Sequence, residues 1–386
     1  VYGRAARAIA SAQDSLKLLP PQALNIRAIA IATIAIGLQM QGDLGQAIAM
    51  IKGELADHTR PAGLHARMEH YLCLVHLQEG DLTGVLRAAG EYLPVAEQHQ
   101  IGEVVTYGRC NLGIAHYLRH DFAQAEPYLL ALLEDRALSA PTYLTNGVFA
   151  LALIYHAWGR VSEADQAIDL LFSFLREAND TFAWAMGESM RVELALRQGK
   201  LSDARRLSEG VEFDLRFPMW FLYVPQLTPL KLLLAEGTAE NLAEAGARLA
   251  VLEAEMRRIN RKNVLIDVLA LQALVCDAQG DHPSALEKLR AALELGVVGG
   301  NIRSFVDLGP PMAGLLRRLR QVHMDRGSHT LAYVDRILAA FGPETEHEQP
   351  PKARTSAGPS PPPLRGSAGA WTEALTGREL EVLADL

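Results

Sequence analysis

The residues best suited to chemistry are histidines that lie on apolar stretches of the chain. His116 and His120 are four residues apart, a spacing that places two side chains on one face of a helix, where they could hold a metal ion. No third ligand accompanies them, and His120 stands where the chain is expected to turn. His65, His70 and His76 do not share one helix face. We interpret His116 and His120 as a packed histidine and a turn residue, and we expect no metal site.

Motifs for catalysis are also missing. The sequence contains neither Gly-x-Ser-x-Gly, which presents a nucleophilic serine, nor Gly-x-x-x-x-Gly-Lys-Ser/Thr, whose backbone amides cradle nucleotide phosphates. Cys73, Cys110 and Cys276 lie in apolar runs without a Cys-x-x-Cys pair, which is typical of buried thiols in a reducing cytoplasm. No carboxylate pair stands apart from ordinary surface acids. We predict that this chain is not an enzyme and binds no cofactor.

Composition narrows the possible partners. The chain has 386 residues, of which 49% are hydrophobic, and a formal net charge of -8. Because an acidic chain is repelled by a phosphate backbone, the bulk of it should not bind nucleic acid non-specifically. The apolar run from Ile26 to Met40 contains Arg27 and is too short to span a bilayer, so we expect no membrane contact and a cytoplasmic location. Since the sequence starts at Val1, we expect a fragment or a processed product.

Turn signatures recur along the chain at a spacing of 38 to 43 residues. They are centred on Gly42, Gly80, His120, Gly159, Gly199, Gly237 and Gly280. An apolar helical stretch precedes each turn, and an amphipathic one follows most of them. Such a period is the signature of a helical repeat, in which no unit can bury its apolar face without its neighbours.

The residue types within one unit indicate how its helices end and pack. Glycine can end the first helix in a left-handed conformation, and an aspartate or a nearby serine such as Ser162 or Ser202 can cap the second. Small residues recur on both sides of the turn, where they would let the paired helices approach closely. They are Ala47, Ala125, Ala164, Ala204 and Ala285 after the turn, and Ala35, Cys73, Gly113, Ala152 and Ala273 before it.

This arrangement resembles the tetratricopeptide family, although the period exceeds that family's usual length of about 34 residues. Val85, Val192 and Leu230 also stand where a small residue is expected. The resemblance implies an all-α fold of tetratricopeptide-like helix-turn-helix repeats, stacked as an α-solenoid or superhelix over residues 1–341. The first unit is expected to be incomplete, because residues 2–19 have the pattern of a second helix. The alternative is an unrelated all-α bundle.

The last part of the chain changes character. Gly309-Pro310-Pro311 should break one helix and start another, and a further helix is expected from about Thr330 to Phe341. Residues 342–372 are rich in Pro, Gly, Ser and Ala, which predicts a disordered linker. In residues 373–386, Thr376 and Glu379 form a capping box at the start of a new apolar helix face.

The stretch Leu375-Thr376-Gly377-Arg378-Glu379-Leu380-Glu381-Val382-Leu383 resembles the opening of a LuxR-type helix-turn-helix domain. The stretch from Phe305 to Leu316 resembles the end of the repeat region in the large MalT-like class of that family. The resemblance implies a transcriptional regulator with an ATP-binding domain upstream, so that ATP would act outside this chain. DNA would be bound only through helices beyond Leu386. The alternative is a helix start that matches by chance.

Polar side chains on otherwise apolar first helices mark a candidate binding surface. In tetratricopeptide arrays these helices line the concave wall, so the resemblance assigns to it Arg67, His70, Tyr107, Tyr117, Asn146, His156, Glu193, Arg197, Lys231, Asp267 and Asp277. Because burying such groups unpaired is costly, we expect them to face water or a ligand. The alternative is a solvated groove that has no small-molecule site.

The functional prediction follows from the repeats and the resemblance together. We expect a signal-sensing, oligomerisation and protein-interaction module that binds a small-molecule inducer or a regulatory protein in its groove, with possible self-association. Charge reversal at Arg67 and at Lys231 should weaken that binding. The alternative is a constitutive tetratricopeptide adaptor, which would bind peptides or proteins without an inducer.

Overall fold

The structure is a computed structural model that describes residues 5–57, 59–215, 221–323 and 329–342. Over these ranges the regular secondary structure is entirely helical. The expected helix-turn-helix start at residues 373–386 lies outside the described residues, as does the expected linker apart from Gly342. None of the helices described has the length and apolar character needed to cross a membrane.

The helices form seven pairs, units 1 to 7, in chain order. They are α2 (Leu24–Met40) with α3 (Leu44–Leu55), α4 (Ala62–Gln78) with α5 (Leu82–Gln98), α6 (Gly102–Leu118) with α7 (Phe122–Glu134), α8 (Pro141–Ala157) with α9 (Val161–Ala178), α10 (Thr181–Arg197) with α11 (Leu201–Ser208), α12 (Leu227–Glu236) with α13 (Ala239–Arg258), and α14 (Lys262–Ala278) with α15 (His282–Gly299). Helix α1 (Ala5–Leu18) precedes them and packs against α2. A 3-10 turn (Arg136–Leu138), α16 (Arg303–Val306), α17 (Pro310–His323) and α18 (His329–Ala340) complete the described chain.

All seven predicted turns are confirmed, and each has a left-handed residue at its centre. The six glycines have φ between 68° and 89°, and His120 takes the same conformation with φ 66°. Glycine adopts this region without the steric cost that a Cβ brings, which explains its recurrence. His120 is the one position of the seven where a side chain bears that cost.

The second helices are capped less uniformly than expected. Asp43, Asp81 and Asp281 each accept a hydrogen bond from a backbone amide in the first turn of the helix that follows. The expected caps at Ser162 and Ser202 are wrong. Helices α9 and α11 begin one residue before these serines, so both serines lie inside the first turn and cannot serve as its cap.

The small residues on both sides of the turns are buried, as predicted. Ala35, Ala47, Cys73 and Ala152 are fully inaccessible to solvent, and a Cβ on Gly113 would come within 2.4 Å of a Leu129 methyl carbon. Close approach of the paired helices therefore depends on these positions. The larger residues Val85, Val192 and Leu230, which stand where a small residue was expected, are buried as well.

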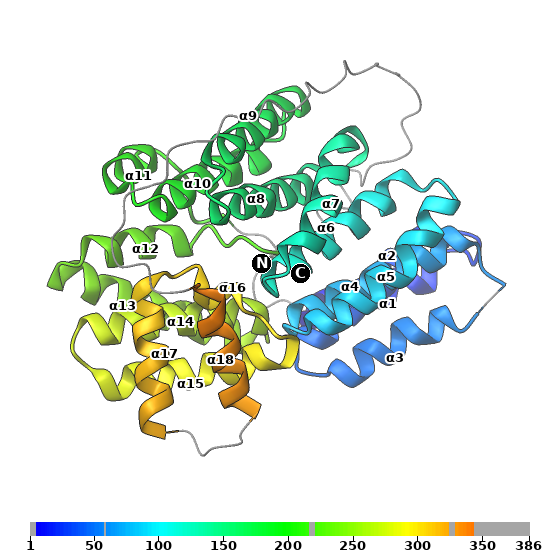
Figure 1. Cartoon of the computed structure of the whole chain (residues 1–386). Coiled ribbons are helices and arrows are strands. Elements are labelled where there is room, and N and C mark those ends of the chain that lie inside the picture. Colours follow the sequence, from blue (N-terminus) through cyan, green and yellow to red (C-terminus); the bar gives the residue numbers. More distant parts are fainter. Residues whose placement is uncertain (1–4, 58, 216–220, 324–328, 343–386) are drawn as a thin grey trace.

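The stacked pairs turn through almost a full circle (Figure 1). Units 1 and 2 lie on one side, units 3 to 5 pass over the top, and units 6 and 7 return toward the start. Helix α14 then lies beside α4 and α15 beside α5, and the Ile302 amide donates a hydrogen bond to the Leu118 carbonyl at 2.7 Å. The superhelix therefore closes on itself, with α16 near its centre.

Candidate functional site

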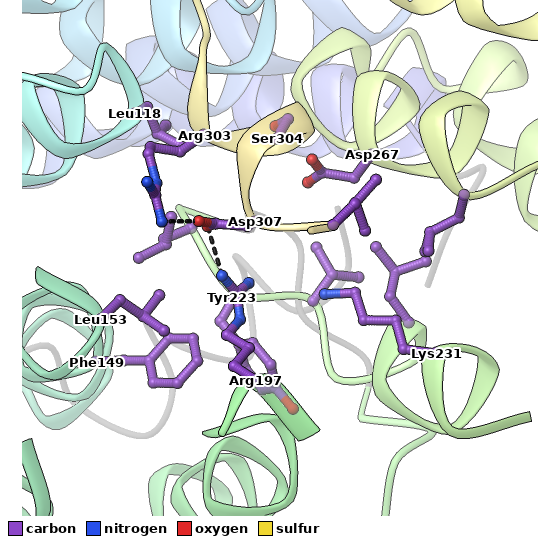
Figure 2. Close-up of a pocket in the computed structure, with 15 residues that line it drawn as sticks. Leu118, Phe149, Leu153, Arg197, Tyr223, Lys231, Asp267, Arg303, Ser304 and Asp307 are labelled. Carbon is purple, nitrogen blue, oxygen red and sulfur yellow. Dashed lines mark ion pairs between the residues drawn. The ribbon is translucent and has the colours of Figure 1, made fainter. Parts of the chain in front are cut away.

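A cavity lies at the centre of the superhelix, where α6, α8, α10, α12, α14 and α16 converge (Figure 2). It encloses about 530 Å³ of empty space, including the part that opens to solvent. Its apolar lining comes mainly from leucines, and its charged lining consists of Arg197, Lys231, Asp267, Arg303 and Asp307. A second cavity of about 360 Å³ adjoins the first, because Leu118, Leu222, Val224, Asp267 and Ser304 line both.

Asp307 is the central ionic group of this cavity. Its carboxylate lies 2.6 Å from Arg197 and also contacts Arg303 (Figure 2). The Tyr117 hydroxyl donates a hydrogen bond to the same carboxylate. Burial alone would raise the pKa of Asp307, but the two guanidinium charges hold that pKa at about 2. Asp307 therefore stays ionised and joins units 3 and 5 to the chain that follows unit 7.

Glu193 forms a second paired acid directly behind the cavity wall. Its carboxylate accepts hydrogen bonds from Lys231 at 2.5 Å, Arg197 at 2.9 Å and Thr228 at 3.0 Å. Burial acts to raise the pKa of Glu193, but the neighbouring charges of Lys231 and Arg197 lower it to about 2. Arg197 is thus shared between Glu193 and Asp307, which fixes its orientation toward the cavity.

Asp267 differs from both of these acids. It makes no ion pair with any residue that the structure describes, although the Ser304 hydroxyl donates a hydrogen bond to it. Burial raises the pKa of Asp267 to about 6, while Ser304 and the charge of Lys231 act in the opposite direction. Because Asp267 lines both cavities, it presents an acceptor to each of them. The cavity therefore offers hydrogen-bond donors from Arg197 and Lys231 and a carboxylate from Asp267, set among leucine side chains.

A separate aromatic cluster surrounds His70 in units 2 to 4. The His70 ring stacks on Tyr107 with centroids 4.7 Å apart, its Nε2 lies 2.9 Å from the Tyr143 hydroxyl, and its Nδ1 lies 3.3 Å from the Tyr92 hydroxyl. Burial lowers the pKa of His70 to about 3, with help from the Arg67 charge, so the imidazole is neutral. The His70 ring is therefore enclosed by aromatic side chains and makes its hydrogen bonds within the protein.

Asn146 lies between the two groups and holds an irregular segment in place. Its side-chain oxygen accepts hydrogen bonds from the backbone amides of Leu222 at 3.4 Å and Tyr223 at 3.2 Å. Phe221 packs on Tyr143, and Tyr223 packs on Phe149 of α8. This segment, which follows the short helix α11, contributes Leu222 and Val224 to the lining of both cavities.

The predicted groove residues therefore separate into groups. Arg197, Lys231 and Asp267 line the central cavity, while Tyr117, Glu193 and His156 support it from behind, with His156 Nε2 lying 3.1 Å from the Arg197 carbonyl oxygen. His70 and Tyr107 belong to the aromatic cluster, and Arg67 pairs with Glu103 beside it at 3.0 Å. Asp277 lies elsewhere, in ion pairs with His282 and Arg318 that tie α14 to α17.

The expectation that these polar groups face water or a ligand is wrong for His70, Tyr117, Asn146 and Glu193. All four are at least 97% buried. They avoid the cost of unpaired burial because the chain itself supplies partners: Asp307 for Tyr117, residues 221–228 for Asn146 and Glu193, and tyrosines of neighbouring helices for His70. Partners so distant in sequence could not be read from helix periodicity.

Sequence reasoning also missed several residues of the cavity. Arg303, Ser304 and Asp307 follow the last repeat unit, outside the first helices that define a repeat groove. The available signal was the pair of opposite charges four residues apart, Arg303 and Asp307, with apolar residues between and after them. Tyr223 and Thr228 gave no signal, because they lie where the repeat pattern is least regular.

Comparison with known families adds one finding. The family described as the MalT-like TPR region matches residues 1–322 of the chain. No curated protein matches the chain.

Proposed function

Because this chain belongs to the MalT-like tetratricopeptide family, whose helical repeats are of the sensing and protein-interaction type, we propose that it is the signal-sensing module of a LuxR-family transcriptional regulator. In this proposal a small polar inducer binds in the central cavity. Inducer binding changes the contacts of the chain with partner proteins and with other copies of itself. DNA and ATP are bound by other domains of the regulator. The proposal assigns no catalytic step to this chain and places the regulator in the cytoplasm.

The observation that carries the proposal is Asp267, which lines the cavity with Arg197 and Lys231 and has no ion-pair partner among the described residues. A half-buried carboxylate of raised pKa without such a partner is costly, and groups of this kind are concentrated at functional sites. Arg197 and Lys231 keep part of their side chains exposed at 15% and 22%, so donor groups remain open toward the cavity. A ligand with both donor and acceptor groups would satisfy both sides at once.

A thermal-shift screen of the chain against sugars, metabolites and short peptides tests this proposal. A ligand that binds only the folded state adds about 2.7 kcal/mol of stability at a hundredfold excess over its Kd. Lys231→Met and Asp267→Asn should abolish the shift produced by a hit. Arg67→Glu should preserve it, because Arg67 lies outside the cavity lining.

The outcomes separate the two candidate functions. A hit that survives both cavity substitutions, in variants whose circular dichroism is unchanged, would remove the cavity as the site. A screen without any hit, combined with capture of a protein partner by the unliganded chain, would favour the constitutive adaptor.

A further inference from the structure

One part of the ring closure is a narrow contact, which we call the seam; the Ile302–Leu118 hydrogen bond and the Asp307 ion pairs are the other part. The two sides of the seam are far apart in sequence: the ends of the first helices of units 1 and 2 on one side, and the entry and exit of unit 7 on the other (Figure 1). The residues that meet there are Gln39, Glu79 and Gly80 from the first side, and Asn260, Lys262 and Gly299 from the second.

Polar groups make the central contacts of the seam. The Glu79 carboxylate accepts hydrogen bonds from Gln39 Nε2 at 2.8 Å, Asn260 Nδ2 at 2.8 Å and Lys262 Nζ at 2.5 Å. Gln39 and Asn260 also donate side-chain hydrogen bonds to each other's backbone carbonyls, at 2.8 and 3.0 Å. An ion pair and amide groups thus join parts of the chain that are some 180 to 220 residues apart.

Such a contact contributes little net stability to the closed ring. Gln39 is fully buried and Glu79 is 7% exposed, so closure removes both from water. In addition, the side-chain oxygens of Gln39 and Gln78 are buried without a hydrogen-bond partner among the described residues. On separation all of these groups would regain water, which offsets much of what the ion pair and hydrogen bonds contribute. Interfaces that open reversibly are polar in this way, whereas permanent ones are more apolar.

Gly299 shows how close the two sides lie. It is in helix α15 without a positive φ, so its backbone conformation would accept alanine. A Cβ at this position would nevertheless come within 2.0 Å of the Gly80 carbonyl oxygen and 2.7 Å of the Leu82 amide nitrogen. At Gly299 the backbones of the two sides therefore lie almost in contact.

The second cavity lies directly beneath the seam. Leu77, Gly80 and Leu82 line it from the first side, and Val264 and Asn301 line it from the second. It shares the Asp267 and Ser304 wall with the central cavity. We propose that the seam is a gate: the ring opens and closes along it, and opening exposes the second cavity and through it the site of the proposed function. The role of the gate in ligand entry rests on the proposed function. Opening of the seam does not, because it is measured without ligand.

Reaction of a thiol placed beneath the seam reports opening directly. Val264 is 3% exposed and lines the second cavity, so Val264→Cys should react with a small methanethiosulfonate reagent only when the seam opens. Cys276→Ser removes the partly exposed native thiol, and Cys73 and Cys110 are fully buried. Ala152→Cys, at the position that Cys73 occupies in unit 2, reports global unfolding instead.

Two substitutions should open the seam by different means. Gly299→Ala forces the backbones apart, and Glu79→Lys places two ammonium groups together. Each should raise the Val264→Cys reaction rate by about tenfold, equivalent to about 1.4 kcal/mol of opening free energy. The double variant Glu79→Lys/Lys262→Glu should return the rate to that of the parent. Gly314→Ala in α17 is the matched control, because a Cβ there meets nothing within 4 Å.

The result that overturns the gate is equally specific. The seam does not open separately from the fold if the Val264→Cys thiol reacts no faster in the Glu79→Lys and Gly299→Ala backgrounds than in the control. The same conclusion follows if these substitutions raise the reaction rate of the Ala152→Cys thiol equally. Hydrogen exchange on the otherwise unsubstituted chain gives an independent test. The Ile302 amide, bonded across the closure to Leu118, should exchange faster than core amides of α8, whereas equal protection would contradict the proposal.

Discussion

The Asp307 carboxylate lies 2.6 Å from the Arg197 guanidinium, which connects the end of unit 5 to the segment that follows unit 7. Asp307→Asn would leave Arg197 and Arg303 as buried cations without their shared partner. We expect a loss of about 3 kcal/mol in the free energy of unfolding, as found when one partner of a buried pair is removed. Urea denaturation measures this change.

The exposed ion pair between Arg320 and Asp335 provides the control for that experiment. Arg320→Gln should cost less than about 1 kcal/mol, because exposed ion pairs are largely screened by solvent. Equal losses in the two variants would mean that Asp307 acts as an ordinary surface acid.

Asp267 should make stability depend on pH in an unusual direction for an acid. Its pKa of about 6 in the folded state exceeds the usual value of 3.8, so folding favours the protonated form. The resulting stability is fully present below about pH 4 and is lost as pH rises through 6. We expect Asp267→Asn to gain up to about 2 kcal/mol at pH 7 and nothing at pH 4.

The paired acids supply the opposite trend in the same protein. The pKa values of Glu193 and Asp307, both about 2, are depressed, so their contribution is present above about pH 4 and is lost as pH falls toward 2. Denaturation of the parent and Asp267→Asn at several pH values separates the two effects. A constant difference between these proteins from pH 4 to 7 would show that Asp267 does not titrate in this range.

The aromatic cluster gives a prediction about a single hydroxyl group. Tyr143→Phe keeps the ring but removes the partner of His70 Nε2, which is buried. We expect a cost of about 1–3 kcal/mol, the usual penalty for a buried polar atom left unpaired. Tyr128→Phe, in a partly exposed tyrosine of α7, should change stability by less than about 0.5 kcal/mol. Thermal melts of both variants compare them, and an equal effect would contradict the role of the hydroxyl.

Helix spacing within a unit can be tested at Gly113. Gly113→Ala would push a Cβ against the Leu129 side chain, and we expect a loss of about 1–3 kcal/mol from overpacking. In α3, Gly53→Ala places its Cβ in open space and should stabilise the protein by about 0.5–1 kcal/mol through helix propensity. Urea denaturation should therefore show opposite signs, and two stabilising changes would contradict the close packing at Gly113.

The repeat was predictable because its determinants are local. A glycine that ends a helix and small residues at fixed distances from it act within about twenty positions, so Gly42 and Ala47 reveal the turn and the pairing together. His120 could be identified as a turn only by its place in the period.

The site was predictable only in part, because its completion is not local. Arg197, Lys231 and Asp267 follow from helix register, whereas Asp307 and Tyr223 reach the cavity from segments without a repeat pattern. Ring closure brings them there, and closure depends on the accumulated rotation of seven units, which no single unit encodes. For the same reason His70 could be placed on the inner wall but not recognised as enclosed by tyrosines.

Closure also limits how such a gene can evolve. Open solenoids tolerate tandem duplication or loss of a unit, because each unit contacts only its neighbours. Here the Ile302–Leu118 hydrogen bond requires the last unit to return to a fixed place beside the third. One additional unit of about forty residues, the length seen here, would carry α16 past that place. We therefore expect the number of units to be fixed, and variation to concentrate in residue identity instead of copy number.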